Sequence, residues 1–440
     1  MKISAFYENE YLQSASYQSF RTIASYVDGF KNGARKIVYT IDKFNITTNL
    51  KVSQLSSKVA ETTAFLHGEG SLYSAIVGLA QNFPGSNNIN ILLPEGNFGN
   101  RFIQEASAGR YIYTKKSKYF DAILRKEDKD ILIPQEFEGE EIESKFFVPI
   151  IPLLLVNGSE GIGNGFAQKI LQRDEKEIIK IIENNLSGKK IPSIKPHVKG
   201  YKGTINVDSE GKVEIVGKID VVGANTLKIT EIPFTYNLQQ YMSVLNELED
   251  NKVIKSYKDL SENDNFEFDI NCTREFAQTP MEDLINIFKL SKKITENFTC
   301  IDENNTIIEF KNEKELLAAY IKMRLQYYTL RKKSLLKKIE YENDVLSNKL
   351  AFVEAVINKK IEVSNKSKSD IEKQLTKLKI KKFDNGYDYI LRMAIYSLSK
   401  DKYTELKNDL AANMKKYDDL KNKTEKDLWM NDLQELKSIL

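Results

Sequence analysis

From residue 281 to residue 440 the sequence contains no proline and only one glycine, Gly386, and this constrains the fold more than any other feature. Because proline and glycine are the residues least favourable inside helices, long helices can form here. Apolar residues recur mostly at steps of three, four or seven, at Leu317, Ile321, Leu325, Tyr328, Leu335, Ile339, Leu346, Leu350, Val353 and Ile357. This spacing predicts a helix of about 45 residues, roughly 65 Å long, with the apolar stripe of a coiled coil.

A compact apolar segment at residues 387–398 interrupts the helical pattern, which resumes at Tyr403 and continues to about Leu440. The pattern therefore predicts an antiparallel arm, in which a returning helix packs along the outgoing one. The arm alone cannot bury an apolar tip. We expect copies of the chain to associate through this tip, around residues 383–402.

The composition is that of a soluble globular protein, with 41% hydrophobic and 29% charged residues among 440. This length allows two or three domains with hydrophobic cores. We find no apolar run of about 18 residues and no secretory signal, so we expect no membrane span and a cytoplasmic location. Two cysteines, Cys272 and Cys300, and two histidines, His67 and His197, are too few for a disulfide framework or for a thiolate- or histidine-rich metal site.

The net charge of +3 is unevenly distributed. Residues 1–120 contain 13 Lys/Arg and 8 Asp/Glu, whereas the remaining residues contain 52 and 54. The basic excess favours binding of a polyanion by the N-terminal part. Within it, residues 12–45 are expected to form helices separated by a turn at Asp28, and the second helix begins with Lys31, Arg35 and Lys36. This is the outline of a helix-turn-helix or winged-helix DNA reader, and equally of a solvated basic face.

A tyrosine, Tyr111, directly follows Arg110 in a segment that begins with small residues. With a pKa near 10, a phenol is a poor nucleophile at neutral pH until a cation or a base stabilises its ionised form. Arginine stays charged and its planar fork matches two phosphate oxygens, so Arg110 can stabilise the transition state of attack on a phosphodiester. The pair indicates either such a nucleophile or a tyrosine packed at the edge of an element. Glycines in residues 92–101, just before the pair, permit close approach of the backbone to a ligand.

A second glycine cluster, NGSEGIGNG at residues 157–165, lacks the Gly-Lys-Ser/Thr end of a P-loop and the spacing of a dinucleotide-binding motif. We interpret it as a tight turn beside an apolar strand at residues 149–156. No ATP-binding motif is recognised in the sequence.

Between about Tyr201 and Phe276 the apolar period shifts towards two, which is typical of strands. The expected elements are strands at 203–207, 212–216 and 226–230, a hairpin turn at 208–211, and a helix near 237–248. This part is expected to be an α+β domain.

Taken together, these stretches resemble the breakage–reunion part of type IIA DNA topoisomerases over nearly the whole chain. The resemblance is carried by VDGFKNGARKIV at residues 27–38, HGEGSL at 67–72, LAQNFPGSNN at 79–88 and NGSEGIGNG at 157–165. Residues 67–72 and 79–88 are most similar to the eukaryotic form. The sequence departs from the family at Leu66, where the first of two histidines is usual, and at Leu171, where a proline is usual.

The resemblance implies that Tyr111 attacks DNA and holds a 5′-phosphate as a reversible phosphotyrosine. Arg110 falls on the family's active-site pair with it, and Arg21 falls where the family has a second catalytic arginine. Ile170 lies where the family inserts an isoleucine between base pairs to bend the DNA. The other positions matched to DNA contacts are Lys31, Arg35, Lys36, Lys51, Gln54, His67 and Lys169.

The fold implied by the resemblance is α+β and multidomain. It comprises a winged-helix DNA-gate domain at 1–165, an α/β tower domain at 166–310, and a long antiparallel coiled coil with a small helical dimerisation tip at 311–440. The expected assembly is a homodimer, joined at the DNA gate and at the coiled-coil tip, on double-stranded DNA.

The layout is similar to that of the medium subunit of the multi-subunit topoisomerase of T-even-like phages. The implied reaction is ATP-dependent relaxation and decatenation, in which a second duplex passes through a transient double-strand break. Mg²⁺ and ATP are then expected on a separate partner subunit that carries the ATPase and metal-binding parts. The location would be the host cytoplasm if the protein is viral.

Two other functions fit the sequence less well. A tyrosine recombinase needs an Arg…His-x-x-Arg set, and neither His67 nor His197 is followed by arginine at that spacing. A catalytically inactive, DNA-binding coiled-coil scaffold is the remaining alternative, and the intact pair of Arg110 and Tyr111 argues against it.

Overall fold

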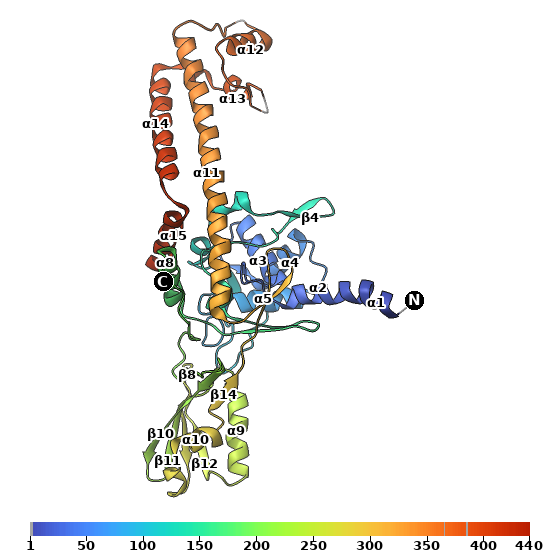
Figure 1. Cartoon of the computed structure of the whole chain (residues 1–440), viewed down its shortest axis with the longest axis vertical. Coiled ribbons are helices and arrows are strands. Elements are labelled where there is room, and N and C mark those ends of the chain that lie inside the picture. The colour runs from blue at the N-terminus through green and yellow to red at the C-terminus, as the bar shows by residue number, and fades with distance from the viewer. Residues whose placement is uncertain (1–2, 365, 384–385) are drawn as a thin grey trace. The chain divides into compact units, whose positions relative to one another are not determined.

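The computed structural model describes residues 3–364, 366–383 and 386–440 (Figure 1). The chain folds into two compact units. One unit comprises Met1–Arg324 together with Met430–Leu440, and the other comprises Leu325–Trp429. The secondary structure is α+β, as predicted. In the described part of the chain, no helix is both long enough and apolar enough to cross a membrane.

The N-terminal part of the first unit is helical. Its helices are α1 (Ile3–Phe6), a π-helical turn (Tyr7–Tyr11), α2 (Leu12–Thr22), α3 (Asn32–Lys43), α4 (Val52–Thr62) and α5 (Glu69–Ala80). Helix α3 is strongly amphipathic, and its apolar residues Ile37, Val38 and Ile41 are fully buried. The helices predicted before and after the turn at Asp28 are therefore confirmed.

A small antiparallel sheet follows these helices, with strand order β1-β3-β2. Its strands are β1 (Leu50–Lys51), β3 (Tyr113–Lys116) and β2 (Leu92–Glu95). The central strand, β3, begins two residues after Tyr111, so the sheet fixes the path of the chain just beyond that residue. Leu92 of β2 and Ile112, immediately before β3, are buried.

The prediction of a strand at residues 149–156 is wrong. The chain instead forms helix α7 (Leu153–Asn157), directly after Pro152. A short apolar run does not distinguish a buried strand from a buried helix, and a proline suits the position just before a helix. The glycine cluster that follows is also more than a turn, because it forms most of the hairpin of β6 (Ser159–Ile162) and β7 (Ala167–Ile170).

Two further sheets build the middle of the chain, with strand orders β14-β9-β8 and β10-β11-β13-β12. The strands are β8 (Thr204–Val207), β9 (Val213–Val216), β10 (Lys218–Gly223), β11 (Thr226–Glu231), β12 (Ser256–Asp259), β13 (Phe268–Asn271) and β14 (Ser291–Ile294). The predicted strands, hairpin turn and helix are confirmed here. Helix α9 (Leu238–Asp250) begins with a capping box between Asn237 and Gln240.

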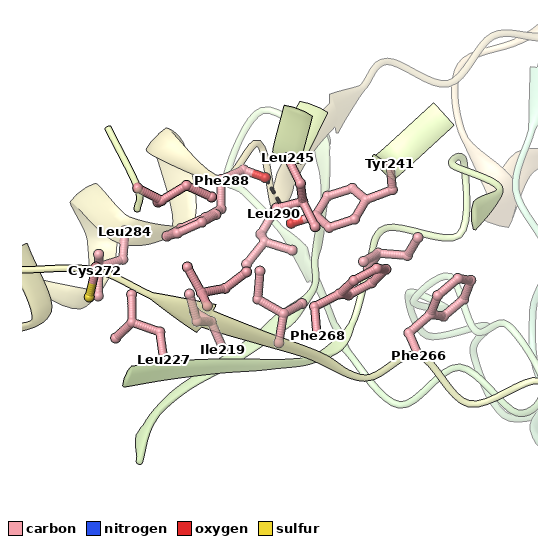
Figure 2. Close-up of a cluster of buried hydrophobic side chains, with 14 of the residues drawn as sticks. Ile219, Leu227, Tyr241, Leu245, Phe266, Phe268, Cys272, Leu284, Phe288 and Leu290 are labelled. Carbon is pink, nitrogen blue, oxygen red and sulfur yellow. Dashed lines mark hydrogen bonds between the residues drawn. The ribbon is translucent and has the colours of Figure 1, made fainter. Parts of the chain in front are cut away.

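A buried cluster lies between the four-stranded sheet, α9 and α10 (Met281–Ile287) (Figure 2). Tyr241 is fully buried there, and its hydroxyl donates to the backbone oxygen of Phe288 at 3.0 Å. A buried phenol needs such a partner, because an unpaired hydroxyl in an apolar core is costly.

The remaining elements of the first unit are short, apart from helix α8. They are β4 (Gln135–Phe137), β5 (Glu140–Ile142), α6 (Phe120–Ile123), α8 (Glu175–Leu186), β15 (Phe298–Ile301) and β16 (Ile307–Phe310), with 3₁₀ turns at Lys126–Ile131 and Phe276–Gln278. Of these, the β4–β5 hairpin contributes side chains to the cavity described below.

The second unit contains most of the long helix α11 (Glu313–Ile357), whose 45 residues confirm the predicted length. The returning segment is not one helix. It consists of α14 (Lys400–Asn422) and α15 (Glu425–Ile439), and Thr424 caps the start of α15 by accepting from the backbone of Asp427 at 3.1 Å.

The tip of the second unit contains α12 (Lys368–Lys377), α13 (Asp388–Leu391) and a 3₁₀ turn (Ile395–Leu398). Phe352, Ile361, Leu375 and Ile390 form a buried cluster there. The predicted tip at residues 383–402 includes 384 and 385, which lie outside the described residues.

Candidate active site

The turn that carries Arg110 and Tyr111 presents an accessible phenol beside a cation. The side chain of Tyr111 is 66% exposed, and Cζ of Arg110 lies 4.8 Å from the centroid of its ring. The backbone N–H of Tyr111 donates to the oxygen of Ala108 at 2.8 Å, which closes the turn. A guanidinium stacked on an exposed phenol can reach a phosphate that the phenol oxygen attacks.

The first turn of α4 holds this turn by two backbone hydrogen bonds. The N–H of Val52 donates to the oxygen of Ile112 at 3.0 Å, and the N–H of Ser53 donates to the oxygen of Gly109 at 3.2 Å. Because the first N–H groups of a helix have no partner inside it, they are free to bind another segment. Two predicted DNA contacts belong to the same helix start: Lys51, half-buried at the N-cap position, and Gln54, exposed one turn later.

Tyr73 of α5 holds the turn from a second direction, and sequence reasoning missed it. Its hydroxyl donates to the backbone oxygen of Ser107. A Cβ atom added to Gly109 would lie 2.4 Å from Cε2 of the Tyr73 ring, so only glycine allows this approach. Burial raises the pKa of Tyr73.

A cavity of about 550 Å³ gathers four of the predicted site residues, Arg21, Lys31, Lys36 and His67. It lies among α2, α3, α5 and the β4–β5 hairpin, and its wall is largely apolar. Arg110 and Tyr111 are not among its lining residues. The predicted residues at this cavity are therefore a separate group from Arg110 and Tyr111, and Lys169 and Ile170 on β7 form a third group.

Lys31 is half-buried in this cavity, and its Nζ donates to the backbone oxygen of Glu160 at 2.7 Å. Burial lowers the pKa of Lys31, and the negative charge of Glu160 partly opposes this shift. Arg21, by contrast, is exposed at the cavity and lies against the ring of Tyr17. Both cations line the cavity.

Arg35 is engaged inside the protein. Its Nε and a terminal nitrogen donate to the two carboxylate oxygens of Asp28 at 2.7 and 3.1 Å, and Asp28 is fully buried. Burial lowers the pKa of Arg35, but the adjacent Asp28 outweighs this effect and the pKa is raised overall. Asp28 also accepts from the backbone N–H groups of Phe30 and Phe147. Arg35 therefore secures the start of α3, and any effect on DNA would be indirect.

Lys36 is likewise paired internally, since its Nζ lies 2.7 Å from a carboxylate oxygen of Glu143 and donates to the oxygen of Thr63 at 3.0 Å. Glu143 is only 3% exposed. Burial raises the pKa of Glu143, and Lys36 opposes this rise. Although Lys36 lines the cavity, its charge is already compensated.

The position of Ile170 does not fit the wedge role expected for it. The side chain is 3% exposed, so it could enter a base step only by leaving the core. The exposed isoleucine of the same hairpin is Ile162, at the end of β6, with 75% exposure. Which of the two isoleucines is buried depends on which face of the hairpin packs inward, and the sequence alone does not determine that face.

The hairpin packs closely against α2, which explains its glycines. A Cβ atom on Gly161 would lie 2.0 Å from the backbone oxygen of Thr22, and one on Gly163 would lie 2.9 Å from Oγ of Ser19. Gly161 and Gly163 of the cluster therefore allow the hairpin to pack against α2.

Lys169, on β7, is half-exposed, and its Nζ lies 2.8 Å from a carboxylate oxygen of Glu160. It lines an open hollow of about 790 Å³ together with Lys292 and Lys293. These three lysines form a second basic region. Ser159 lines both this hollow and the cavity around Arg21, and the other lining residues of the two differ.

Among the described residues, no three or more His, Cys, Asp or Glu side chains are grouped in a way that could hold a metal ion. The residues present here therefore do not fit a Mg²⁺ site.

Comparison with known proteins decides the family. The model of the family described as the A subunit of DNA gyrase/topoisomerase IV matches residues 21–434. The chain belongs to this family.

Type II topoisomerases are similar to this chain along nearly its whole length. The mitochondrial DNA topoisomerase 2 of Dictyostelium discoideum is 34% identical over 99% of this chain and 35% of its own length. DNA topoisomerase 2-beta of Homo sapiens is 33% identical over 97% of this chain and 29% of its own. The chain thus spans about a third of the length of these curated relatives.

A solved structure has the same fold. The crystal structure of the Plasmodium falciparum topoisomerase II DNA-binding, cleavage and re-ligation domain superposes with a TM-score of 0.91 at 33% identity, covering 98% of this chain and 64% of that one. The long helix and the α+β arrangement of this family member therefore match a topoisomerase II cleavage core.

Proposed function

We propose that this chain is the DNA-cleaving and religating part of a type IIA topoisomerase, and that Tyr111 is its nucleophile. The observation that carries the proposal is the exposed phenol of Tyr111, stacked with Arg110 on a turn held from two sides, in a chain of this family. The alternative function, a catalytically inactive DNA-binding scaffold, does not explain that arrangement.

In the proposed reaction the phenol oxygen of Tyr111 attacks a backbone phosphorus. The bond from phosphorus to the 3′ oxygen breaks, the phenol proton is given up, and the departing 3′ oxygen gains a proton. Tyr111 then holds the 5′-phosphate, and Arg110 neutralises charge on the phosphate oxygens. Religation is the reverse attack by the 3′ hydroxyl. One phosphoester replaces another in each direction, so resealing needs no external energy.

Arg21, Lys31 and His67 are proposed to bind the DNA backbone at the cavity, while Lys51 and Gln54 bind it beside the Tyr111 turn. Lys169 extends this contact towards Lys292 and Lys293. Lys36 and Arg35 contribute by holding α3. Ile162 replaces Ile170 as the proposed wedge, because only an exposed apolar side chain can enter a base step.

The proposed domain division is a winged-helix DNA gate at 1–165, a tower at 166–310, and a coiled-coil arm at 311–440. Helices α3–α5 with the sheet β1-β3-β2 support the first assignment. Two Tyr111 side chains are needed to cut both strands, so the working form is proposed to be a homodimer on double-stranded DNA. The dimer contacts are the gate and the tip.

Type II topoisomerases depend on ATP and Mg²⁺. The described residues contain no acidic cluster that could hold Mg²⁺. We propose that the metal and the ATPase belong to a separate partner chain, as in the phage-type layout that the sequence resembles. Mg²⁺ supplies charge neutralisation at the scissile phosphate when bound. Passage of a second duplex, relaxation and decatenation are proposed for the complete enzyme.

The test is cleavage of an end-labelled duplex by the complete enzyme, assembled from this chain and the part that carries the ATPase and metal site. Tyr111→Phe should abolish cleavage while DNA binding by the chain is retained. Tyr113→Phe, which removes the hydroxyl of a partly exposed tyrosine on β3, should cleave normally. Equal cleavage by Tyr111→Phe and the wild type would reject the proposal.

A further inference from the structure

Tyr17, on α2, contacts two residues to which the proposed function gives a DNA-binding role. Its hydroxyl is hydrogen-bonded to Nε2 of His67, and the two rings lie 5.9 Å apart. Cζ of Arg21 lies 5.8 Å from the centroid of the Tyr17 ring. All three line the 550 Å³ cavity. One tyrosine therefore links the imidazole to the guanidinium.

The hydrogen bond matters because a neutral imidazole has one donor and one acceptor nitrogen, and the partner of one nitrogen decides which is which. If the phenol donates to Nε2, the proton of the ring is on Nδ1. Only the protonated nitrogen can donate to a phosphate oxygen. The ring of Phe65 also packs edge-on against the imidazole of His67, with 5.4 Å between the ring centroids and an angle of 74° between the rings.

His67 stands alone at this position. The residue before it, Leu66, is 78% exposed and has no side-chain hydrogen-bond donor. With a single imidazole available, a wrong tautomer would leave the phosphate without a histidine donor. The tautomer and orientation of His67 therefore decide whether a histidine donor is available at this site.

We propose that Tyr17 is a positioning residue for DNA binding. Its hydroxyl holds His67 as the tautomer protonated on Nδ1, directed to a backbone phosphate, and its ring supports Arg21. The inference rests on the proposed function in taking the DNA backbone as the ligand.

Histidine spectra test the hydrogen bond directly. The full chain has only two histidines, His67 and His197, so long-range proton–nitrogen spectra of histidine-labelled protein contain two imidazoles, and His67→Gln assigns them. The wild type should show an unprotonated Nε2 and a protonated Nδ1 for His67. Tyr17→Phe should shift these signals and leave those of His197 unchanged. A proton on Nε2 in the wild type, or unchanged His67 signals in Tyr17→Phe, would overturn the proposal.

Binding of a short fluorescent duplex to the full chain, at fixed salt, tests the consequence. Tyr17→Phe keeps the ring that supports Arg21 and should raise Kd about 2- to 10-fold, as expected for one hydrogen bond. The double variant Tyr17→Phe/His67→Ala should bind like His67→Ala alone, because the hydroxyl acts through the imidazole. Tyr11→Phe, in the same N-terminal segment but outside the cavity lining, should bind like the wild type.

A Kd of Tyr17→Phe equal to that of the wild type would overturn the inference. A double variant whose Kd rises by the product of the two single-variant increases would also overturn it. A wild-type chain that binds no duplex would overturn both this inference and the proposed function. A third outcome is that the wild type binds the duplex and the variants show the expected coupling, but DNA cleavage does not depend on Tyr111. This outcome would reject only the cleavage function and would support the role of Tyr17.

Discussion

Tyr73 and Gly109 pack so closely that a methyl group at position 109 would lie 2.4 Å from Cε2 of the tyrosine ring. The same tyrosine donates its hydroxyl to the backbone oxygen of Ser107. Helix α5 is thereby tied to the turn that carries Tyr111, two residues beyond the glycine. The position of the proposed nucleophile therefore depends on the packing of its turn against α5.

Substitution Gly109→Ala is expected to displace this turn. Overpacking should lower the free energy of unfolding by about 1–3 kcal/mol. Cleavage by the complete enzyme should slow by on the order of 10²-fold, the cost of misplacing a reacting group by about 1 Å. Urea unfolding and a cleavage time course measure the two effects. The matched control is Gly70→Ala in α5, where an added Cβ meets nothing within 4 Å. Wild-type stability and cleavage in Gly109→Ala would contradict the packing argument.

Arg35 and Lys31 should separate stability from DNA binding. Arg35→Ala leaves the buried Asp28 carboxylate without its cation, which should cost about 3–5 kcal/mol of unfolding free energy. Lys31→Ala should leave stability nearly unchanged and reduce the slope of log affinity against log salt by about 1, as for one phosphate contact. Urea unfolding and salt-dependent binding distinguish them. A stable Arg35→Ala protein with a reduced salt slope would show that Arg35 contacts DNA directly.

The two isoleucines of the β6–β7 hairpin should behave in opposite ways. Ile170→Ala removes a buried side chain and should cost about 2–5 kcal/mol of stability. Ile162→Ala removes an exposed one and should change stability little, but it should reduce DNA bending by the complete enzyme. Energy transfer between dyes at the two ends of a duplex reports the bend. Unaltered bending in Ile162→Ala would remove the wedge assignment from this hairpin.

Glu143 should give stability a specific pH dependence. Burial raises its pKa above the ordinary value of 4.5, with Lys36 opposing the rise. The folded form then binds more protons than the unfolded form between 4.5 and the raised pKa, so the contribution of Glu143 to stability falls as pH rises through that window. Urea midpoints measured from about pH 4.5 upward should fall less steeply in Glu143→Gln than in the wild type. Parallel curves would mean that the carboxyl titrates normally.

The fold could be predicted best where local pattern and tertiary structure agree. Helix α11 was predictable because its apolar stripe extends over many turns without a breaker. The break between α14 and α15 was missed, although Thr424 followed three residues later by Asp427 is a readable capping signal. The helix α7 was missed because an apolar run of that length fits a strand equally well.

The candidate site was predictable in its residue types but less so in its contacts. The exposed pair of Arg110 and Tyr111 could be expected from the sequence, whereas the support from Tyr73 depends on packing between segments 34 residues apart. The internal ion pair of Arg35 and the burial of Ile170 likewise depend on which face of an element turns inward. Sequence pattern alone does not determine those orientations.

The central claim is that the oxygen of Tyr111 becomes bonded to a cleaved strand. The most direct measurement is to trap the protein–DNA adduct formed by the complete enzyme, digest it, and identify the modified peptide by mass spectrometry. The account predicts a single nucleotide adduct on Tyr111, linked through the 5′-phosphate, and none in Tyr111→Phe. An adduct on any other side chain, or one linked through a 3′-phosphate, would contradict it.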